Sequence, residues 1–253
     1  MAAISTDTTS FEAVDWLRRV AHETLGLRLS LLQVEAFQRY LEALRAASTR
    51  HNLTAVIDPL GIAAKHFLDS LTLVPLLGAA ASGRLADVGT GAGFPGLPLR
   101  IVCPELKVTL IEATHKKAEF CRAVADDLRL RGVEVLAARA EDVGRDPAHR
   151  HAYDVATGRA VAALPVLLEY LLPLVRVGGR VLAQKGESAP MEVQQSGRAL
   201  EVLGGRLIRL HPVELPGVAE RRYIVEIEKT AATPETYPRR AGIPAKRPLV
   251  ARG

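Results

Sequence analysis

The segment 85–96, which reads LADVGTGAGFPG, restricts the fold of this chain more than any other part of its sequence. Asp87 ends an apolar run there. Three glycines follow at alternate positions: Gly89, Gly91 and Gly93. Glycines at this spacing let the backbone turn sharply and approach a ligand closely, because a Cβ would block both. A second apolar run, 107–112, ends in a carboxylate, and this order of strand, glycine loop, helix, strand and acid predicts a nucleotide or adenosyl cofactor site.

The same glycines fit two kinds of cofactor. Read as the segment 91–96, they match the GxGxxG pattern of dinucleotide-binding proteins. A pyrophosphate needs donors and no repelling charge, whereas Asp87 adds a carboxylate and Pro95 removes an N–H. S-adenosylmethionine (SAM) carries an ammonium and a sulfonium, which favour an acid beside the loop. We therefore expect SAM, with Glu112 accepting hydrogen bonds from two ribose hydroxyls; a nicotinamide-dependent oxidoreductase is the alternative.

The pattern of apolar residues predicts alternating strands and helices from residue 84 onward. Strands are expected at 84–88, 107–112, 133–138, 153–157 and 179–185, and helices at 95–103, 114–131 and 164–176. Helices of this length between strands imply right-handed βαβ units in a parallel sheet. Two further strands, 206–214 and 222–229, predict a closing antiparallel hairpin. The expected fold is a class I SAM-dependent methyltransferase: α/β, Rossmann-like, with a mostly parallel seven-stranded sheet and an N-terminal helical extension.

The N-terminal part of the chain carries two helix-start signals. The segment Ser30-Leu-Leu-Gln33 has the spacing of a capping box, and Asp58-Pro59 supplies an N-cap acid followed by proline. On the helix after Pro59, one face carries His66, Asp69 and Ser70. That face is either a packed helix end or a contact with the substrate.

The chain is predicted to divide into a helical extension at 1–75, a methyltransferase domain at 76–232 and a basic tail at 233–253. Its net charge is +5 and its pI is about 9.4, and the tail has no acid from residue 239 onward. Prolines in the tail predict an extended path over a surface. The tail is either a solvated end or a phosphate-binding segment. The residues that would contact phosphate are Arg239, Arg240, Lys246 and Arg247.

Composition argues against several other classes of protein. Apolar residues make up 48% of the chain and aromatic residues only 4%. We expect no run of transmembrane length, and the first residues lack the features of a secretory signal, so the expected location is cytoplasmic. Cys103 and Cys121 have no metal-binding spacing, and the histidines show none either. Buried thiols and no metal are therefore expected.

Ligands of an open α/β sheet bind beyond the carboxyl ends of its strands. Besides the glycine loop, this rule selects Glu112-Ala113-Thr114, Ala140-Glu141, 157–160 and Lys185-Gly186. Glu141 either accepts from the adenine amino group or is an acid favoured by a helix N-terminus. Arg159 directly follows an apolar strand, so its planar donors are placed to orient cofactor or substrate phosphate. Lys185 has the same position on the next strand.

Taken together, these motifs resemble the RsmG (GidB) family of bacterial small-subunit rRNA guanine-N7 methyltransferases. The segments that carry the resemblance are Asn52-Leu-Thr-Ala, Lys65-His66-Phe-Leu-Asp69-Ser70, Asp87 to Gly96, Gly158-Arg159-Ala160, Gln184-Lys185-Gly186 and Tyr237 to Leu249. Their combination is specific, although each piece alone is not. The resemblance implies methyl transfer from SAM to N7 of guanine 527 of 16S rRNA, naked or in the small subunit. We expect the enzyme to be a monomer.

The resemblance also assigns residues by position. Those implied to contact the cofactor are Gly89, Phe94, Glu112, Ala113, Thr114, Ala140, Glu141 and Arg159, in addition to Asp87, Gly91 and Gly93 from the loop itself. Those assigned to the RNA or the target base are Lys116, Arg139 and Lys185, and His66 through its helix face. Gly158 and Glu112 depart from the serine and aspartate that are commoner in the family. The first departure removes a hydroxyl and the second lengthens the ribose ligand.

The chemistry implied by the resemblance needs no general base, because guanine N7 already has a free lone pair. Arg159 and Lys185 are therefore expected to orient the reactants, a positioning effect. Two other functions stay open. One is methyl transfer to a small molecule or a protein, which would not lose activity steeply with salt. The other is a non-catalytic ribosome-assembly factor that keeps the fold, whose RNA binding would survive replacement of Asp87.

Overall fold

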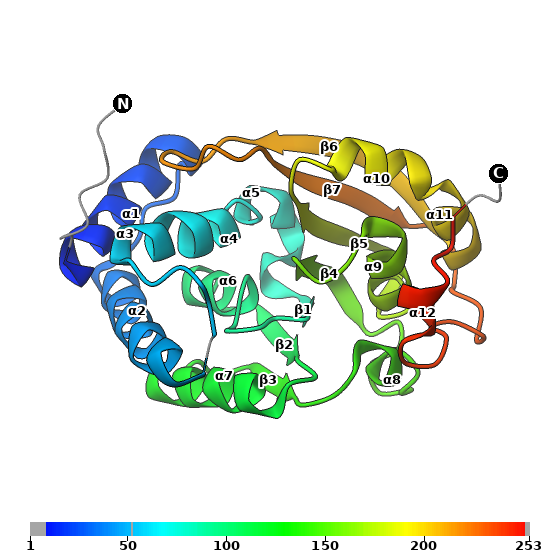
Figure 1. Cartoon of the computed structure of the whole chain (residues 1–253), viewed down its shortest axis with the longest axis horizontal. Coiled ribbons are helices and arrows are strands. Elements are labelled where there is room, and N and C mark those ends of the chain that lie inside the picture. Colours follow the sequence, from blue (N-terminus) through cyan, green and yellow to red (C-terminus); the bar gives the residue numbers. More distant parts are fainter. Residues whose placement is uncertain (1–8, 52, 251–253) are drawn as a thin grey trace.

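A seven-stranded β-sheet forms the centre of the molecule (Figure 1). The computed structural model describes residues 9–51 and 53–250. The strands are β1 Arg84–Val88, β2 Lys107–Ile111, β3 Val133–Leu136, β4 Tyr153–Arg159, β5 Val175–Lys185, β6 Gly205–Val213 and β7 Arg222–Lys229. Their spatial order is β3-β2-β1-β4-β5-β7-β6, and β7 runs antiparallel to both of its neighbours. The predicted sheet, mostly parallel with a C-terminal antiparallel hairpin, is confirmed.

The chain changes direction across the sheet between β1 and β4. It first runs outward from β1 through β2 to β3 and then returns to β4 on the other side of β1. Asp87 on β1 therefore pairs with Leu110 on one side and Thr157 on the other. Such a reversal leaves a crevice beyond the carboxyl ends of the strands, where ligands of open α/β sheets bind. The glycine loop, Glu112 and Arg159 all lie at this edge.

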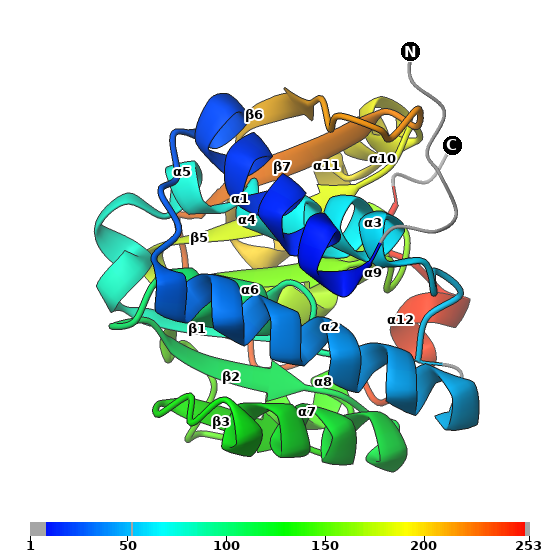
Figure 2. The same ribbon diagram turned by 90° about the vertical axis from the view of Figure 1, so that its left-hand side faces the viewer.

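Helices cover both faces of the sheet (Figures 1 and 2). One face is covered by α1 Ser10–Leu25, α2 Leu31–His51, α3 Pro59–Ile62, α4 Asp69–Leu71, α5 Val74–Leu77, α6 Gly96–Val102 and α7 His115–Asp127. The other face is covered by α8 Ala140–Val143, α9 Leu164–Leu171, α10 Ala189–Gln195, α11 Gly197–Leu203 and α12 Ile243–Lys246. The N-terminal helices share one continuous apolar core with the first face.

Aromatic rings gather where α2 meets the glycine loop. Tyr40 on α2 stacks on Phe94 with ring centroids 5.4 Å apart, and Phe67 lies 5.2 Å from Tyr40. The buried hydroxyl of Tyr40 donates a hydrogen bond to the carbonyl of Ala92 in the loop. The N-terminal helices thus support the loop directly, although aromatic residues are scarce in the chain.

Both predicted helix starts are confirmed. The amide of Ser30 donates to the side chain of Gln33 (2.9 Å), and the amide of Gln33 donates to the Ser30 hydroxyl (3.3 Å). Asp58 accepts from the amide of Gly61 (2.6 Å) as the N-cap of α3, with Pro59 at the first helical position. Beyond α3 the helix widens into a π-helical turn, Ala63–Leu68, which carries His66.

The strand and helix bounds differ from the prediction in the second half of the chain. The helix α9 ends at Leu171 instead of residue 176, and β5 begins at Val175 instead of residue 179. The reason is an irregularity in β5, because Tyr153 pairs with Val175 whereas Val155 pairs with Arg180. Gly178 and Gly179, which lie between Val175 and Arg180, have a composition typical of a turn. Helices α10 and α11 were not predicted at all.

The stretch Pro59–Ser82 has the length and mean hydropathy, 1.3 over 18 residues, of a helix that crosses a membrane. The expectation that no run reaches this length was therefore wrong. In the structure the stretch is divided into α3, the π-helical turn, α4, α5 and a 3-10 turn at Gly78–Ser82, and 61% of its apolar window is buried. These are the properties of a core segment.

The tail after β7 follows the surface of α8 and α9 with little regular structure apart from α12. Carbonyl groups along it accept hydrogen bonds from two arginines of the sheet domain. Arg150 donates to Thr233 (2.7 Å) and Tyr237 (2.8 Å), and Arg145 donates to Pro238 (2.8 Å). The described part of the tail is therefore fixed to the rest of the molecule.

Candidate functional site

Asp87, near the end of β1, stabilises the glycine loop through hydrogen bonds to its carboxylate. Its carboxylate is fully buried and accepts from the hydroxyl of Thr90 (2.6 Å) and the amide of Gly96 (2.8 Å). Burial raises the pKa of Asp87 to about 6, although both hydrogen bonds act in the opposite direction. Its second oxygen has no hydrogen-bond partner within the described residues. Asp87 thus closes the loop on itself, and its predicted contact with the ammonium of SAM stays a prediction.

The three alternate glycines take the conformation that their spacing predicts. Gly89, Gly91 and Gly93 have φ values of +67°, +61° and +99°, a region that side chains with a Cβ rarely adopt. A Cβ at Gly89 would lie 2.6 Å from Val161, so the backbone is tightly packed there. A Cβ at Gly91 would meet nothing closer than 4.0 Å. The space above Gly91 is therefore open to a ligand.

A cleft of about 270 Å³ lies beyond the ends of β1 and β2, and we call it the β1–β2 cleft. Its lining residues are Val88, Gly89, Ile111, Glu112, Ala113, Ala138, Arg139, Ala140, Glu141, Val161, Tyr170, Gly242 and Ala245. Five of the eleven residues predicted to hold the cofactor line this cleft: Gly89, Glu112, Ala113, Ala140 and Glu141. Arg159, also predicted to contact the cofactor, lines a different cleft.

Two buried carboxylates mark this cleft. Glu112 accepts from the amides of Gly91 (3.0 Å) and Thr114 (2.7 Å), which joins the glycine loop to the end of β2. Glu141 accepts from the amide of Gly242 in the tail (3.0 Å). A buried carboxylate between apolar walls suits the ribose hydroxyls and the adenine amino group, which are hydrogen-bond donors. These two acceptors and the open space above Gly91 therefore fit the adenosine part of SAM.

A second cleft, of about 100 Å³, lies beyond the ends of β4, β5 and the start of β7, and we call it the β4–β7 cleft. Its lining residues are Asp69, Thr72, Arg159, Ala160, Gln184, Lys185, Gly186, Ser188, Val213, Arg222, Tyr223 and Ile224. Arg159 and Ala160 line this cleft, whereas Val161, the next residue, lines the β1–β2 cleft. The two clefts are therefore neighbours on either side of the segment 159–161, in which Ala160 has a left-handed φ of +57°.

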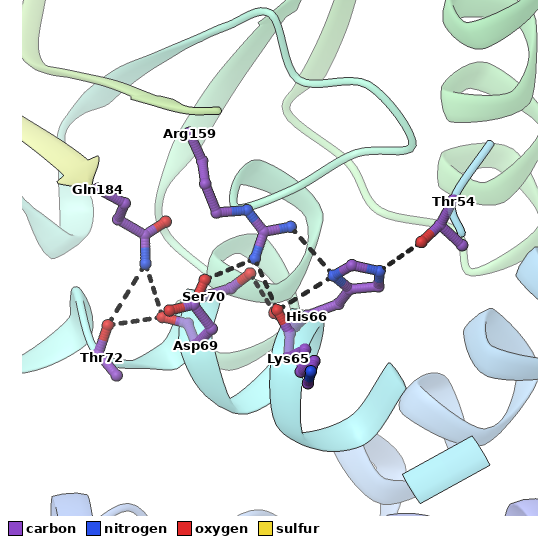
Figure 3. Close-up of polar contacts among 8 residues, drawn as sticks. All are labelled: Thr54, Lys65, His66, Asp69, Ser70, Thr72, Arg159 and Gln184. Carbon is purple, nitrogen blue, oxygen red and sulfur yellow. Dashed lines mark hydrogen bonds and ion pairs between the residues drawn. The ribbon is translucent and has the colours of Figure 1, made fainter. Parts of the chain in front are cut away.

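Arg159 is fixed from several sides (Figure 3). Its guanidinium forms an ion pair with Asp69 (2.7 Å), donates to the carbonyl of Lys65 (3.1 Å) and lies over the ring of Phe94. Both members of the ion pair are buried, with side chains 14% and 5% exposed. Arg159 and Asp69 thus join β4 to the N-terminal helices at the boundary between the two clefts.

His66 belongs to the same network. Its Nδ1 lies 3.1 Å from the carbonyl of Lys65 and 3.5 Å from the guanidinium of Arg159, and its Nε2 lies 2.7 Å from the hydroxyl of Thr54. Burial, aided by the charge of Arg159, lowers the pKa of His66 to about 3. The ring is stacked on Phe94 with centroids 4.8 Å apart. His66 is therefore neutral at physiological pH, and both of its nitrogens have partners inside the protein.

Lys185 has its ammonium inside the protein as well. It forms an ion pair with Glu192 (2.7 Å) and donates to the carbonyl of Ala162 (2.7 Å), and its side chain is only 9% exposed. Burial would raise the pKa of Glu192, but hydrogen bonds from Lys185, Ser188 and the amide of Leu164 lower it. Lys185 therefore links the end of β5 to the starts of α9 and α10, and its role toward a substrate stays a prediction.

The cations predicted to contact RNA fall into two groups. In the first group, Lys185 and Arg239 are paired with buried carboxylates: the side chain of Arg239, 24% exposed, contacts Glu169, which has no exposed surface, through both guanidinium and backbone N–H groups. The remaining ones are exposed: Lys116 on α7, Arg139 before α8, and Arg240, Lys246 and Arg247 in the tail. The contact with Glu169 gives Arg239 a structural role that a charge count along the tail does not predict.

Sequence reasoning missed three residues of this region. The sequence places Asp69 on a helix face, but its pairing with Arg159 spans 90 residues and leaves no local pattern. Gln184, buried beside Asp69, was used only as part of a motif. Tyr170 on α9 lines the β1–β2 cleft. The polar side chains Asp69 and Gln184 stand in otherwise apolar runs, which is the one signal that was available.

The family model for GidB, rRNA small subunit methyltransferase G, matches residues 33–221. The chain belongs to this family. It is 56% identical over 224 residues to the ribosomal RNA small subunit methyltransferase G of Roseiflexus sp. (strain RS-1), covering 88% of this chain and 95% of the relative. It is 45% identical over 239 residues to the protein of that name from Desulfitobacterium hafniense (strain Y51), covering 94% and 99%.

Solved structures agree on the fold. A SAM-dependent methyltransferase from Aquifex aeolicus aligns with a TM-score of 0.52 at 22% identity, covering 68% of this chain and 94% of that one. Geranyl diphosphate methyltransferase in complex with SAM aligns with a TM-score of 0.52 at 14% identity, covering 64% and 84%. The fold is that of a class I SAM-dependent methyltransferase. Together with the family, it makes SAM the cofactor of this protein.

Proposed function

We propose that this protein transfers a methyl group from SAM to N7 of guanine 527 of 16S rRNA, and that it acts in the cytoplasm. The observation that carries the proposal is the adjacency of the two clefts. The β1–β2 cleft has the groups that bind an adenosyl moiety, and the segment 159–161 separates it from a second polar cleft. A methyltransferase needs two such adjoining sites, one for the donor and one for the acceptor. The RNA named in the family description supplies the acceptor class.

In the donor site, Glu112 accepts from the ribose hydroxyls and Glu141 from the adenine amino group, while the backbone at Gly89 and Gly91 lies against the cofactor. Bound there, SAM supplies an electrophilic methyl group on its sulfonium. Both carboxylates are now engaged by backbone amides, Gly91 with Glu112 and Gly242 with Glu141. Each has further lone pairs, so cofactor binding adds hydrogen bonds without breaking the loop contacts.

In the acceptor site the protein has to position the base rather than deprotonate it. The imidazole of His66 is neutral, but both of its ring nitrogens already have partners in the protein. The carboxylate of Asp69 is paired with Arg159. Because guanine N7 attacks with its own lone pair, the engagement of these two groups is compatible with the reaction. Holding N7, the methyl carbon and sulfur in line is the main contribution of the protein.

The exposed cations Lys116, Arg139, Arg240, Lys246 and Arg247 are proposed to bind the RNA backbone. Arg139 also lines the β1–β2 cleft, which places it beside the donor. If the three tail cations each neutralise one phosphate, replacing Arg240, Lys246 and Arg247 by alanine lowers the salt slope of RNA binding by about 2 to 3. The affinity for SAM stays unchanged, because none of the three lines the donor site.

The decisive experiment is methyl transfer from labelled SAM to unmodified 16S rRNA, naked or in small subunits, followed by mapping of 7-methylguanine. We expect label at one guanine with the wild type and none with Glu112→Ala. We expect normal labelling with Glu105→Ala, which removes an exposed acid just before the opposite, N-terminal end of β2. Label in another base, or none in either RNA despite measured SAM binding, would reject the proposal. The first result would indicate a different acceptor, and the second a non-catalytic role in ribosome assembly.

A further inference from the structure

The side chain of Gln184, near the end of β5, is buried, with 4% of its surface exposed, and lines the β4–β7 cleft. Its Nε2 donates to the carbonyl of Asp69 (2.7 Å) and lies 3.4 Å from the hydroxyl of Thr72. Because a carbonyl only accepts, the nitrogen must face Asp69 and the amide cannot be flipped. The oxygen therefore points to the opposite side, toward Arg159 (Figure 3).

This oxygen, Oε1, is buried and has no hydrogen-bond partner among residues 9–51 and 53–250. Buried polar atoms almost always have partners, since an unsatisfied one is destabilising. The two charged side chains that line this cleft beside it form ion pairs with carboxylates, Arg159 with Asp69 and Lys185 with Glu192. An acceptor kept in this state at a cleft is explained by a ligand that brings its own donor.

The position of Gln184 on the sheet defines which edge of a base it would meet. Strand β4 lies between β1 and β5 in the sheet. Along the edge of the sheet, the donor site over β1 and β2 is therefore followed by Arg159 and Ala160, which separate the two clefts, and then by Gln184. A planar base lying over β4 and β5 therefore presents one edge to Gln184 and the opposite edge to the methyl donor. Guanine carries N1–H and a 2-amino group, both donors, on the edge opposite N7.

We infer that Oε1 of Gln184 accepts a hydrogen bond from N1–H or the 2-amino group of the target guanine, which makes Gln184 the residue that selects guanine in the acceptor site. This assignment rests on the proposed function. Adenine would present its N1 lone pair to Oε1 in place of a donor. Oε1 would then have no hydrogen-bond partner, and the two acceptors would repel each other. Selection of guanine and delivery of N7 to the donor thus follow from the same contact.

The test compares kcat/KM for three substrates that differ only in the target base. Unmodified 16S rRNA would be assembled by ligation with guanine, inosine, which lacks the 2-amino group, or 2-aminopurine, which lacks N1–H; all three keep N7. The wild type is expected to prefer guanine over at least one analogue by about 10- to 100-fold. Gln184→Met, which has similar volume but no acceptor, is expected to lose that preference.

Ser70→Ala is the control for a structural effect, because it removes a buried hydrogen bond from Ser70 to the carbonyl of His66 beside the same network. It is expected to lower stability and keep the preference among the bases. Equal kcat/KM of the wild type for all three bases would overturn the inference even if Gln184→Met fails to fold, and so would an unchanged preference in Gln184→Met. Absence of transfer to the guanine substrate by the wild type would instead overturn the proposed function, and this inference with it.

Discussion

Replacing Arg239 by methionine tests how much its ion pair with the buried carboxylate of Glu169 contributes to holding the tail on the domain. The guanidinium contacts both oxygens of Glu169, with Nε at 2.9 and 3.2 Å, and Glu169 has no exposed surface. Removing one partner of a buried pair is destabilising by about 3–5 kcal/mol, because the other charge is left without compensation. The backbone amide of Arg239 still donates to Glu169 at 2.8 Å, which places the expected loss near the lower limit, about 3 kcal/mol.

The assay is urea denaturation followed by circular dichroism, together with SAM binding by calorimetry. SAM affinity should fall as well, since Gly242 and Ala245 lie beyond Arg239 in the tail and line the β1–β2 cleft. Arg240→Met is the matched control: its side chain is exposed, so we expect a change within about 0.5 kcal/mol. The double variant Arg239→Met with Glu169→Leu should recover most of the lost stability, because it leaves no buried charge.

A loss below about 1 kcal/mol in Arg239→Met, the value for an exposed ion pair, would refute this account. Unchanged SAM affinity in a clearly destabilised variant would refute the link between the tail and the cofactor cleft. A double variant as unstable as the sum of the single ones would show that the two side chains act independently.

Three further predictions concern the glycine loop. The pKa of Asp87 is about 6 in the folded protein and 3.8 as a free side chain, so the folded state holds this proton more tightly and the free energy of unfolding falls as pH rises from about 4 to 6. Urea titrations should show that the stability of the wild type relative to Asp87→Asn decreases by roughly 3 kcal/mol over this range. A difference that does not change with pH would contradict the burial argument. Gly93→Ala should lose about 2–4 kcal/mol in denaturant titrations, because its Cβ would lie 2.6 Å from the hydroxyl of Tyr40 at a left-handed φ. Gly178→Ala also has a left-handed φ, but its Cβ would make only an ordinary contact with Arg176 at 3.5 Å, so it should lose only the roughly 1–2 kcal/mol of the backbone term. Tyr40→Phe should lose about 1–2 kcal/mol, because it leaves the buried carbonyl of Ala92 unpaired, and an unchanged thermal midpoint would contradict the proposed support of the loop by α2.

Local sequence patterns were sufficient for most of the sheet. Each strand ran as an apolar segment between turn residues, so β1 and β7 were predicted to the residue. The start of β5 was not, because the glycines at 178 and 179 have the composition of a turn and only pairing with β4 makes them part of a strand. The short helices α10 and α11 carry polar residues on much of their surface, which hides their apolar stripe.

In the candidate site, too, the positions of residues follow from local patterns, whereas their long-range partners do not. The residues at strand ends, such as Glu112, Glu141 and Arg159, were found because the parallel sheet brings all its carboxyl ends to one edge. What no local pattern shows is which long-range partner each charge has. Lys185 and Arg239 were both expected to meet RNA, and the structure pairs both with buried carboxylates, Glu192 and Glu169. Such pairings depend on the folded arrangement of segments far apart in the chain.

The contribution of the tail to the cofactor cleft has a consequence for synthesis of the protein. Ribosomes make the chain from its N-terminus, so Gly242 and Ala245 follow β7, the last strand. A nascent chain whose seven strands have emerged can form the whole sheet while one wall of the cofactor cleft is still missing. If the β1–β2 cleft binds SAM as proposed, full affinity for SAM requires a docked tail, and a chain with a complete sheet but an undocked tail is not yet a working methyltransferase.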